Sequence, residues 1–325
     1  MSTAFRLILH ARKKLYSSGV LSSLRLNCPV ISIGNLTMGG TGKTPLVIAI
    51  AEKLRDRGLH PVILSRGYRR SSRSIQVVPT VGPPGDGAAA TRPAGLRWED
   101  VGDEPYMIAC RLGNVPVVVG ADRYQAGLMA ERRSLGDIFI LDDGFQHWRL
   151  HRDLDIVTID PVEWAAGEVL FPTGRWREPK AAISRAHFAC VQEIPGAGAP
   201  SLAIPSFTVR TENQGIYKQD ALIPLETLQN RAIVAFAGIA KPQRFFATLV
   251  SLGIHPVQCV PFRDHHRFSF RDIDNLGGEV RITTEKDAVR LRGLGFTDFL
   301  YLRISVNIPD FERLMSIILG RLSKL

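Results

Sequence analysis

At 325 residues the chain is longer than most single domains, so two domains are expected. Hydrophobic residues make up 45% and charged residues 22%, which is enough apolar material for a large core and excludes a chain disordered throughout. Forty-one Lys and Arg against 31 Asp and Glu give a formal charge of +10, which favours an anionic partner such as nucleotide, nucleic acid or anionic lipid without selecting one.

The first segment of the chain is basic. No acidic residue precedes Glu52, and helical spacing over residues 4–26 puts Phe5, Ile8 and Tyr16 near one face. Such a helix either lies in a membrane interface or packs on its own domain, and the sequence leaves both open. No apolar run reaches the roughly 20 residues of a spanning helix, and the start lacks a signal peptide's apolar core. The composition of this segment does not exclude an organellar targeting leader.

The cysteines indicate neither a metal site nor a disulfide framework. Cys28, Cys110, Cys190 and Cys259 are widely spaced, and no C-x-x-C pair occurs. This usage is typical of reduced, mostly buried thiols in a cytosolic protein.

Strands and helices then alternate. A β-rich run at 29–33 precedes a Gly-rich segment, an apolar-periodic helix that ends near Gly58, and a strand at 61–64. This order is a βαβ unit, which predicts a mostly parallel sheet with helices on both faces. Further buried strands are expected at 115–119, 137–141 and 155–159.

A second, smaller α/β domain is expected after a linker. Residues 82–96 and 195–205 are rich in Gly, Pro and Ala and predict loops, the second of which ends a first domain at 1–205. Extended runs around Asn213-Gln-Gly215 predict a β-hairpin linker over 206–223. The second domain would occupy 224–325, with strands at 232–236, 256–260, 280–283 and 299–304 and helices from Pro242, Ser269 and Phe311.

The strongest motif is Gly34-Asn-Leu-Thr-Met-Gly-Gly-Thr-Gly-Lys-Thr44. Phosphate oxygens need converging backbone N–H donors, which approach closely only where side chains are absent, as at Gly39, Gly40 and Gly42. Lys43 adds a positive charge and Thr44 a hydroxyl suited to Mg²⁺. Thr37 stands where the strict P-loop pattern has its first Gly, yet the strand before the loop and the helix after it supply the expected context.

Acidic residues mark two further places. The strand at 138–141 ends in Asp142 and Asp143, as a Walker B strand does, where a carboxylate can orient Mg²⁺ beside a P-loop. Asp103 and Glu104 stand at a helix start, and spacing alone favours helix capping over a role as general base.

One histidine pair and two arginine-containing segments each allow two interpretations. Asp264-His265-His266 is more typical of an exposed loop than of catalysis, and Ser65-Arg-Gly-Tyr-Arg-Arg70 and Arg175-Trp-Arg-Glu-Pro179 supply guanidinium groups that either bind phosphate or lie at the surface.

Taken together, these motifs resemble the tetraacyldisaccharide 4'-kinase family over nearly the whole chain. The resemblance rests on motifs in the family's order, which are residues 32–45, 64–68, 101–105, 141–147, 177–179, 236–242, 262–266 and 283–288. It implies a P-loop NTPase-like fold and transfer of the γ-phosphate of ATP to the 4'-hydroxyl of a tetraacylated glucosamine disaccharide 1-phosphate, giving lipid IVA.

The resemblance also implies roles for individual residues. Asp103 would be the catalytic base and His265 its partner across the cleft between the domains. Arg177 and Glu178 would face the reacting phosphate or the acceptor. The triphosphate and Mg²⁺ would be held by a set from the P-loop and the acidic positions, Asn35, Gly39, Gly40, Thr41, Gly42, Lys43, Thr44, Glu104, Asp142 and Asp143.

The lipid acceptor implies a peripheral protein at the cytoplasmic face of a bacterial inner membrane, which gives the basic N-terminal segment an anionic surface to bind. We expect a monomer. A GTPase switch is a weaker interpretation because no N-K-x-D motif occurs. Nucleic-acid binding is not expected, since the basic residues beyond the N-terminus are scattered.

Overall fold

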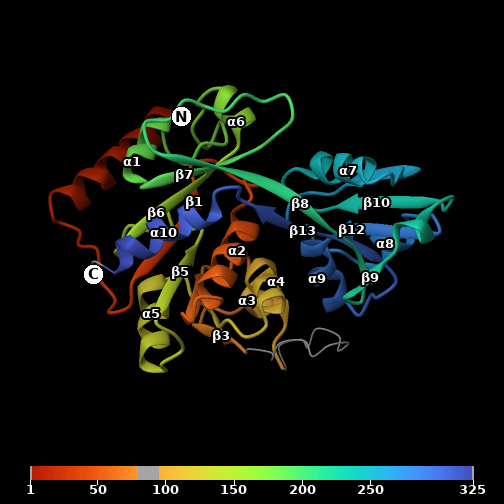
Figure 1. Cartoon of the computed structure of the whole chain (residues 1–325), viewed down its shortest axis with the longest axis horizontal. Helices are drawn as coiled ribbons and strands as arrows, with labels where there is room; N and C mark the ends of the chain where they lie inside the picture. The colour runs from red at the N-terminus through yellow and green to blue at the C-terminus, as the bar shows by residue number, and fades with distance from the viewer. Residues whose placement is uncertain (1, 80–94, 324–325) are drawn as a thin grey trace.

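The computed structural model describes residues 2–79 and 95–323, and most of the expected loop at 82–96 therefore lies outside the described residues. Figure 1 shows two groups of strands joined by long strands at the centre. The helices before the junction are α1 (Ser2–Ser17), α2 (Lys43–Arg55), α3 (Trp98–Val101), α4 (Asp103–Leu112), α5 (Arg123–Arg132) and α6 (Pro161–Ala165). The strands there are β1 (Val30–Asn35), β2 (Pro61–Ser65), β3 (Gln76–Val78), β4 (Val117–Val119), β5 (Ile138–Asp142), β6 (Leu154–Ile159) and β7 (Phe188–Gln192).

The second half of the chain again alternates strand and helix. Its strands are β8 (Ser206–Lys218), β9 (Ala221–Ile223), β10 (Ile233–Ala237), β11 (Gln258–Pro261), β12 (Val280–Thr284) and β13 (Leu300–Asn307). Its helices are α7 (Pro242–Ser251), α8 (Phe270–Asp274), α9 (Glu285–Gly293) and α10 (Phe311–Leu322). Short 3-10 turns occur at Lys180–Arg185 and Leu225–Leu228.

The strands follow one another in the order β11-β10-β12-β13-β8-β7-β6-β1-β5-β2-β4-β3, with β9 beside β8. We call strands β1 to β7 with their helices the N-terminal unit, and strands β10 to β13 with theirs the C-terminal unit. Pairing is parallel within both units except at the β3 edge, and β13 runs antiparallel to β8. The predicted mostly parallel α/β fold with a smaller second α/β unit is confirmed.

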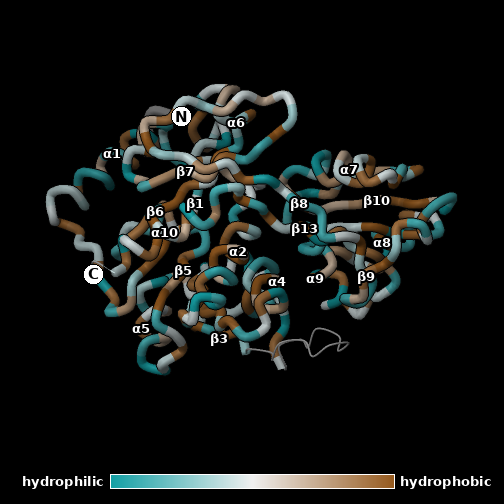
Figure 2. Tube along the Cα trace, in the orientation of Figure 1, coloured by the Kyte–Doolittle hydropathy of each residue, from teal (hydrophilic) through white to brown (hydrophobic). Residues whose placement is uncertain are grey.

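The N-terminal unit is built as its apolar runs predict. Every residue of β1, β2, β5 and β6 is buried, as expected for parallel strands covered on both faces. Leu46 and Ile50 of α2 pack on one face, and Ala126 and Ala130 of α5 pack on the other. Figure 2 shows these central strands as mostly hydrophobic.

The last helix corrects the predicted domain boundary. Leu314, Met315 and Ile318 of α10 lie in the same apolar cluster as Ile31 and Leu46, so α10 covers the N-terminal unit rather than the second domain. In Figure 1, α10 lies beside β1 and β6, far from β10. The C-terminal unit is thus inserted between β8 and α10, and we propose that the second domain ends near Asn307.

The linker is a hairpin, but its turn is not where the sequence predicted. β8 runs unbroken through residues 213–215, and its hairpin with β9 turns at Gln219 and Asp220, both of which have positive φ. Gly215, with a φ of 107°, instead lies where the β8–β13 register shifts. The Asn-Gln-Gly signal therefore marks a β-bulge.

The N-terminal helix ends at Ser17, so the expected helix over 4–26 is too long by several residues. Phe5 contacts Phe171 and Tyr16 contacts Trp148, each edge to face, which holds α1 against its own unit. Ile8, expected on that same face, is exposed. Beyond the helix, Leu26 is buried in the core. Of the cysteines, only Cys190 is buried and Cys259 is exposed, so "mostly buried" was wrong.

Candidate active site

The Gly-rich segment forms a loop between β1 and the start of α2. Gly39 and Gly42 have φ values of 78° and 75°, a region that other residues rarely adopt. Gly42 is the N-cap of α2 and no side chain caps this helix end, which leaves its N–H groups available to an anion. Thr41 fixes the base of the loop. Its hydroxyl oxygen accepts hydrogen bonds from the Thr158 hydroxyl and from the Asn35 side-chain amide, each at 2.8 Å.

Thr37, at the position of the missing glycine, has a structural role. Its hydroxyl donates to Glu163 Oε2 at 2.7 Å and its side chain is buried. The position therefore anchors the loop to α6 instead of approaching a phosphate.

The acidic end of β5 lies beside the loop. Lys43 Nζ is 3.3 Å from Asp143 Oδ1, and one Arg177 nitrogen lies 2.8 Å from both Asp143 oxygens. Burial opposes ionisation of Asp143, but these two cations outweigh it and hold its pKa below the ordinary value. Ser65 donates to Asp142 at 3.2 Å. Burial, together with the charges of Glu104 and Asp143, raises the pKa of Asp142 to about 7.

This crowding of carboxylates fits a divalent cation. Burial and the negative charges of Glu104 and Asp143 oppose ionisation of Asp142, a cost that a bound cation would offset, and oxygen ligands are what Mg²⁺ prefers. Within residues 2–79 and 95–323, no three acidic, His or Cys side chains are already gathered at metal-binding distance. The donors fit Mg²⁺ chemically but would have to converge with the nucleotide.

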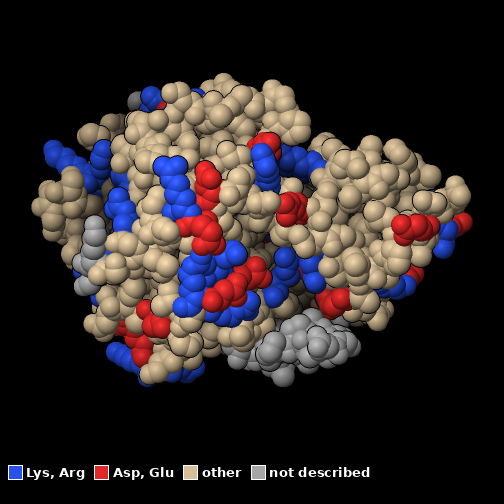
Figure 3. Space-filling model, in the orientation of Figure 1, with Lys and Arg blue, Asp and Glu red and all other residues tan. Residues whose placement is uncertain are grey.

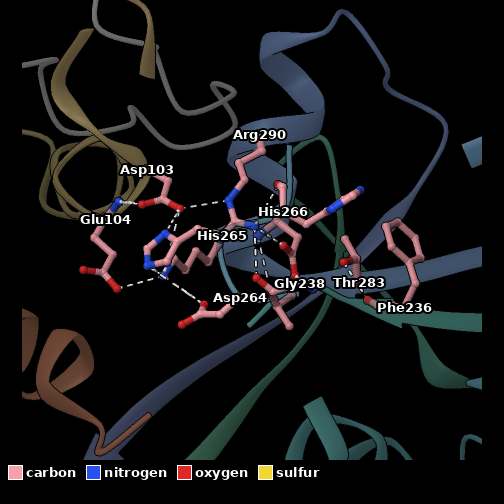
Figure 4. Close-up of polar contacts among 12 residues, drawn as sticks. Asp103, Glu104, Phe236, Gly238, Asp264, His265, His266, Thr283 and Arg290 are labelled. Carbon is pink, nitrogen blue, oxygen red and sulfur yellow. Dashed lines mark hydrogen bonds and ion pairs between the residues drawn. The ribbon is translucent and has the colours of Figure 1, made fainter. Parts of the chain in front are cut away.

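Asp103 and His265 meet across the two units, although 162 positions separate them in the chain. Figure 4 shows the imidazole of His265 turned toward the carboxylate, with Nδ1 2.9 Å from Oδ2. Asp103 is the first residue of α4, and its Oδ1 accepts the N–H of Glu104 at 2.9 Å. Burial opposes ionisation, but the contact with His265 and the charges of Lys286 and Arg290 hold the Asp103 pKa well below its usual range.

The neighbouring histidine has another role. His266 stacks on Phe262 with ring centroids 4.7 Å apart, and its Nε2 lies 3.3 Å from Asp272. Of the two adjacent histidines, His265 is the one that contacts Asp103, and its role as partner of a catalytic base stays a prediction.

Glu178 lies deeper than expected for a residue facing the acceptor. Its carboxylate is buried and accepts from Arg185 at 2.6 Å and from Gln146 at 3.0 Å. Gln146 in turn lies 3.4 Å from Arg177. The geometry gives Glu178 the role of supporting Gln146 and Arg185, and direct contact with substrate stays a prediction.

Several charged residues at the site were not predicted. Lys286 of α9 donates to Glu104 at 2.9 Å and lies 3.9 Å from Asp103. Beside the P-loop, Lys241 and Arg244 from the C-terminal unit form ion pairs with Asp160, which follows β6. Asp160 could have been found from sequence, because it ends a strand of the same parallel sheet as the P-loop strand.

A buried strand, a Gly-rich loop with Lys43, and a neighbouring strand that ends in carboxylates define a P-loop nucleotide-binding protein. The family model described as "Tetraacyldisaccharide-1-P 4'-kinase" matches residues 1–323. The chain belongs to the tetraacyldisaccharide 4'-kinase family.

Relatives with this family name align with the chain over most of the length of both proteins. A tetraacyldisaccharide 4'-kinase of Geobacter metallireducens is 38% identical over 302 residues, which are 90% of this chain and 87% of that protein. One of Koribacter versatilis is 35% identical over 327 residues, which are 96% and 94% of the two chains. A crystal structure described as LpxK from Aquifex aeolicus in complex with ATP is 33% identical and gives a TM-score of 0.82 over 99% of this chain and 97% of that chain.

Proposed function

We propose that this protein is an ATP-dependent kinase that transfers the γ-phosphate to the 4'-hydroxyl of tetraacyldisaccharide 1-phosphate, forming lipid IVA in lipid A biosynthesis. Membership of the family and the ATP in the Aquifex aeolicus structure support the reaction class. The observation that carries the proposal is the Asp103–His265 contact, because it gives a buried carboxylate a histidine partner, and the adjacent Glu104 acts electrostatically on Asp142 and is acted on by Lys43 of the P-loop.

The P-loop would hold the triphosphate. Lys43 would leave Asp143 for the phosphates, and the uncapped start of α2 would supply backbone N–H donors. Thr44, Glu104, Asp142 and Asp143 would be the Mg²⁺ ligands. When bound, Mg²⁺ neutralises charge on the phosphates. Arg177, freed from its carboxylate partner, would stabilise charge on the transferred group.

Asp103 would accept the proton of the 4'-hydroxyl. As the sugar oxygen bonds to the γ-phosphorus, the bond from that phosphorus to the β–γ bridging oxygen breaks, and the hydroxyl proton passes to the carboxylate. The low pKa keeps Asp103 ionised at neutral pH, so it is always ready to accept. A loose transition state needs little proton removal before the phosphoryl group is transferred, and general bases typically contribute about 10²–10⁴-fold.

We propose that the protein acts as a peripheral protein on the cytoplasmic face of a bacterial inner membrane. None of the helices over residues 2–79 and 95–323 is long and apolar enough to cross a bilayer. Leu7 and Ile8 of α1 are exposed by 65% and 63%, next to basic residues of the same helix. Figure 3 shows Lys and Arg along the left edge, where Figure 1 places α1. Apolar side chains flanked by cations suit an anionic membrane surface.

The test is ATP-dependent phosphorylation of purified tetraacyldisaccharide 1-phosphate in mixed micelles. Asp103→Ala should keep nucleotide binding and lose turnover by about 10²-fold or more, because the hydroxyl loses its proton acceptor. Wild-type protein that labels no lipid would refute the kinase proposal. Turnover of Asp103→Ala near that of wild type would remove Asp103 as the base.

A further inference from the structure

Arg290 of α9 is buried in the C-terminal unit, with 1% of its surface exposed, and it reaches the candidate base. Its Nε donates to Asp103 Oδ2 at 2.8 Å. A buried guanidinium is costly to desolvate and must be matched by well-placed partners.

The guanidinium is held by its own unit. Nη1 donates to Asp287 Oδ1 at 2.9 Å, to the carbonyl of Gly238 at 3.0 Å and to the carbonyl of His266 at 3.3 Å. Asp287 is itself fixed, since its other oxygen accepts the Gly238 N–H at 3.0 Å and the Thr284 hydroxyl at 2.7 Å. The direction of the Arg290 Nε–H is therefore set before Asp103 is considered.

Gly238 makes this packing possible. A Cβ at that position would lie 3.1 Å from Asp287 Oδ1 and 3.2 Å from Arg290 Nη1, which is tighter than side chains normally pack. The backbone of residue 238 thus approaches the ion pair as closely as it does because it carries no side chain.

The two oxygens of Asp103 have unequal surroundings. Oδ2 lies within 2.9 Å of His265 Nδ1 and 2.8 Å of Arg290 Nε, and Lys286 Nζ is 3.9 Å away, as Figure 4 shows for the first two. Oδ1 accepts only the N–H of Glu104, at 2.9 Å, among the contacts of the described residues. A carboxylate oxygen has about two acceptor sites, so Oδ1 keeps one available.

We propose that Arg290 is a positioning residue for phosphoryl transfer, which holds Asp103 Oδ2 together with His265 and leaves Oδ1 to accept the proton of the sugar hydroxyl. This inference rests on the proposed function. Because Arg290 belongs to the C-terminal unit, the carboxylate takes its working orientation only while the two units are docked. Arg290 itself contacts no reacting atom.

The alternative is a plain structural tie between the units, and the chain contains a matched control for it. Arg111 of α4 also crosses between the units, with 13% of its side chain exposed, and pairs with Glu285 at 2.7 Å. Arg111→Gln removes a largely buried guanidinium–carboxylate pair between the units and touches neither Asp103 nor His265.

The decisive experiment is a double-mutant cycle on kcat, measured with ATP and tetraacyldisaccharide 1-phosphate. Arg290→Gln should lower kcat by about tenfold or more while KM for ATP changes by less than about threefold. Combined with Asp103→Asn, it should cause no further loss, because it acts through that carboxylate. Arg111→Gln should lower kcat less than Arg290→Gln and by a similar factor in both backgrounds.

Equal losses from Arg290→Gln in the wild-type and Asp103→Asn backgrounds would overturn the proposal and leave a structural tie. If Arg290→Gln does not fold, Arg290→Lys enters the same cycle, since it keeps the charge and loses the fork that bonds Asp103 and Gly238 together. Inactive wild-type protein would instead refute the proposed function. If wild type is active and Asp103→Asn is impaired, additive losses in kcat would contradict the positioning role of Arg290 and leave the proposed function standing.

Discussion

At the scale of single residues, the surroundings of Asp142 favour its protonated form more than those of an ordinary aspartate do. Burial and the neighbouring carboxylates Glu104 and Asp143 raise its pKa to about 7, so Asp142 keeps a proton at a pH where an ordinary aspartate is ionised. A carboxyl whose pKa rises on folding binds more protons in the folded state, and its contribution to stability is lost as pH rises from its unfolded value toward its folded one.

Asp142→Asn should therefore stabilise the metal-free protein near pH 8 relative to wild type, and much less near pH 5, where Asp142 is already protonated. The expected difference in unfolding free energy is on the order of 1 kcal/mol, measured by denaturant titration at both pH values. The same variant should lose Mg²⁺-dependent turnover. A difference that stays flat between the two pH values would contradict the raised pKa.

Glu178 offers a second test at this scale. Replacing it with Gln leaves Arg185 without its charged partner, so Glu178→Gln should lower the unfolding free energy by about 2 kcal/mol along with activity. Thermal or denaturant unfolding measures the first effect and lipid phosphorylation the second. Unchanged stability with lost turnover would mean that Glu178 contacts the substrate instead of supporting Arg185.

Single residues also show which parts of the candidate site could be predicted from the sequence. The Gly spacing and the acidic end of β5 located Lys43, Thr44, Asp142 and Asp143, because those signals are local. The partnership of Asp103 with His265 could not come from spacing, since 162 positions lie between them. It came from the family's motifs, and the cations Lys286 and Arg290 were missed because a Lys or Arg on a helix gives no local sign of burial.

At the scale of elements, α1 divides its two faces between the protein and the solvent. Phe5 and Tyr16 pack on aromatic residues, while Leu7, Ile8 and Leu15 are exposed. The packed face confirms that α1 lies on its own unit, and the exposed apolar side chains are the basis of the proposed membrane contact.

Leu7→Ser combined with Ile8→Ser should weaken binding to anionic vesicles about tenfold or more, since each leucine-sized side chain contributes about 1.5–3 kcal/mol when fully buried in an apolar phase. Sedimentation with vesicles measures this. ATP binding should be unchanged, and activity on micellar substrate should fall less than vesicle binding. Equal vesicle binding by the variant and wild type would remove this face as the membrane contact.

Elements were predicted well where their signal is periodic. The buried parallel strands read as apolar runs, and α10 was placed from its stripe of Leu314, Met315 and Ile318. Periodicity gives the face of a helix but not its partner, which is why α10 was assigned to the wrong unit. The β8–β9 turn was misplaced because Gln219 and Asp220 adopt positive φ without glycine, while Gly215 serves a bulge.

At the scale of the whole molecule, charged residues join the two units in separate places. One set surrounds Asp103, and another links Asp160 to Lys241 and Arg244 of the C-terminal unit. Asp160 is buried, also caps α6, and is the shared partner of both cations.

Asp160→Asn should loosen the contact between the units near the P-loop, because it removes the shared charge while asparagine still caps a helix. Amide hydrogen exchange should become faster in α7 and stay unchanged in α5, which lies away from the contact. The unfolding free energy should fall by about 1–3 kcal/mol. Unaltered exchange in α7 would show that these ion pairs do not hold the units together.

The position of α10 has a consequence for synthesis on the ribosome. Residues 311–322 supply the cover for one apolar side of a sheet whose first strand begins at Val30. Residues 30–310 must therefore emerge before that side is covered, and the inserted unit is translated while the N-terminal unit still lacks this helix. Nascent chains that stall shortly before Phe311 would expose apolar surface that chaperones bind, even though every proposed nucleotide-binding residue had already been synthesised.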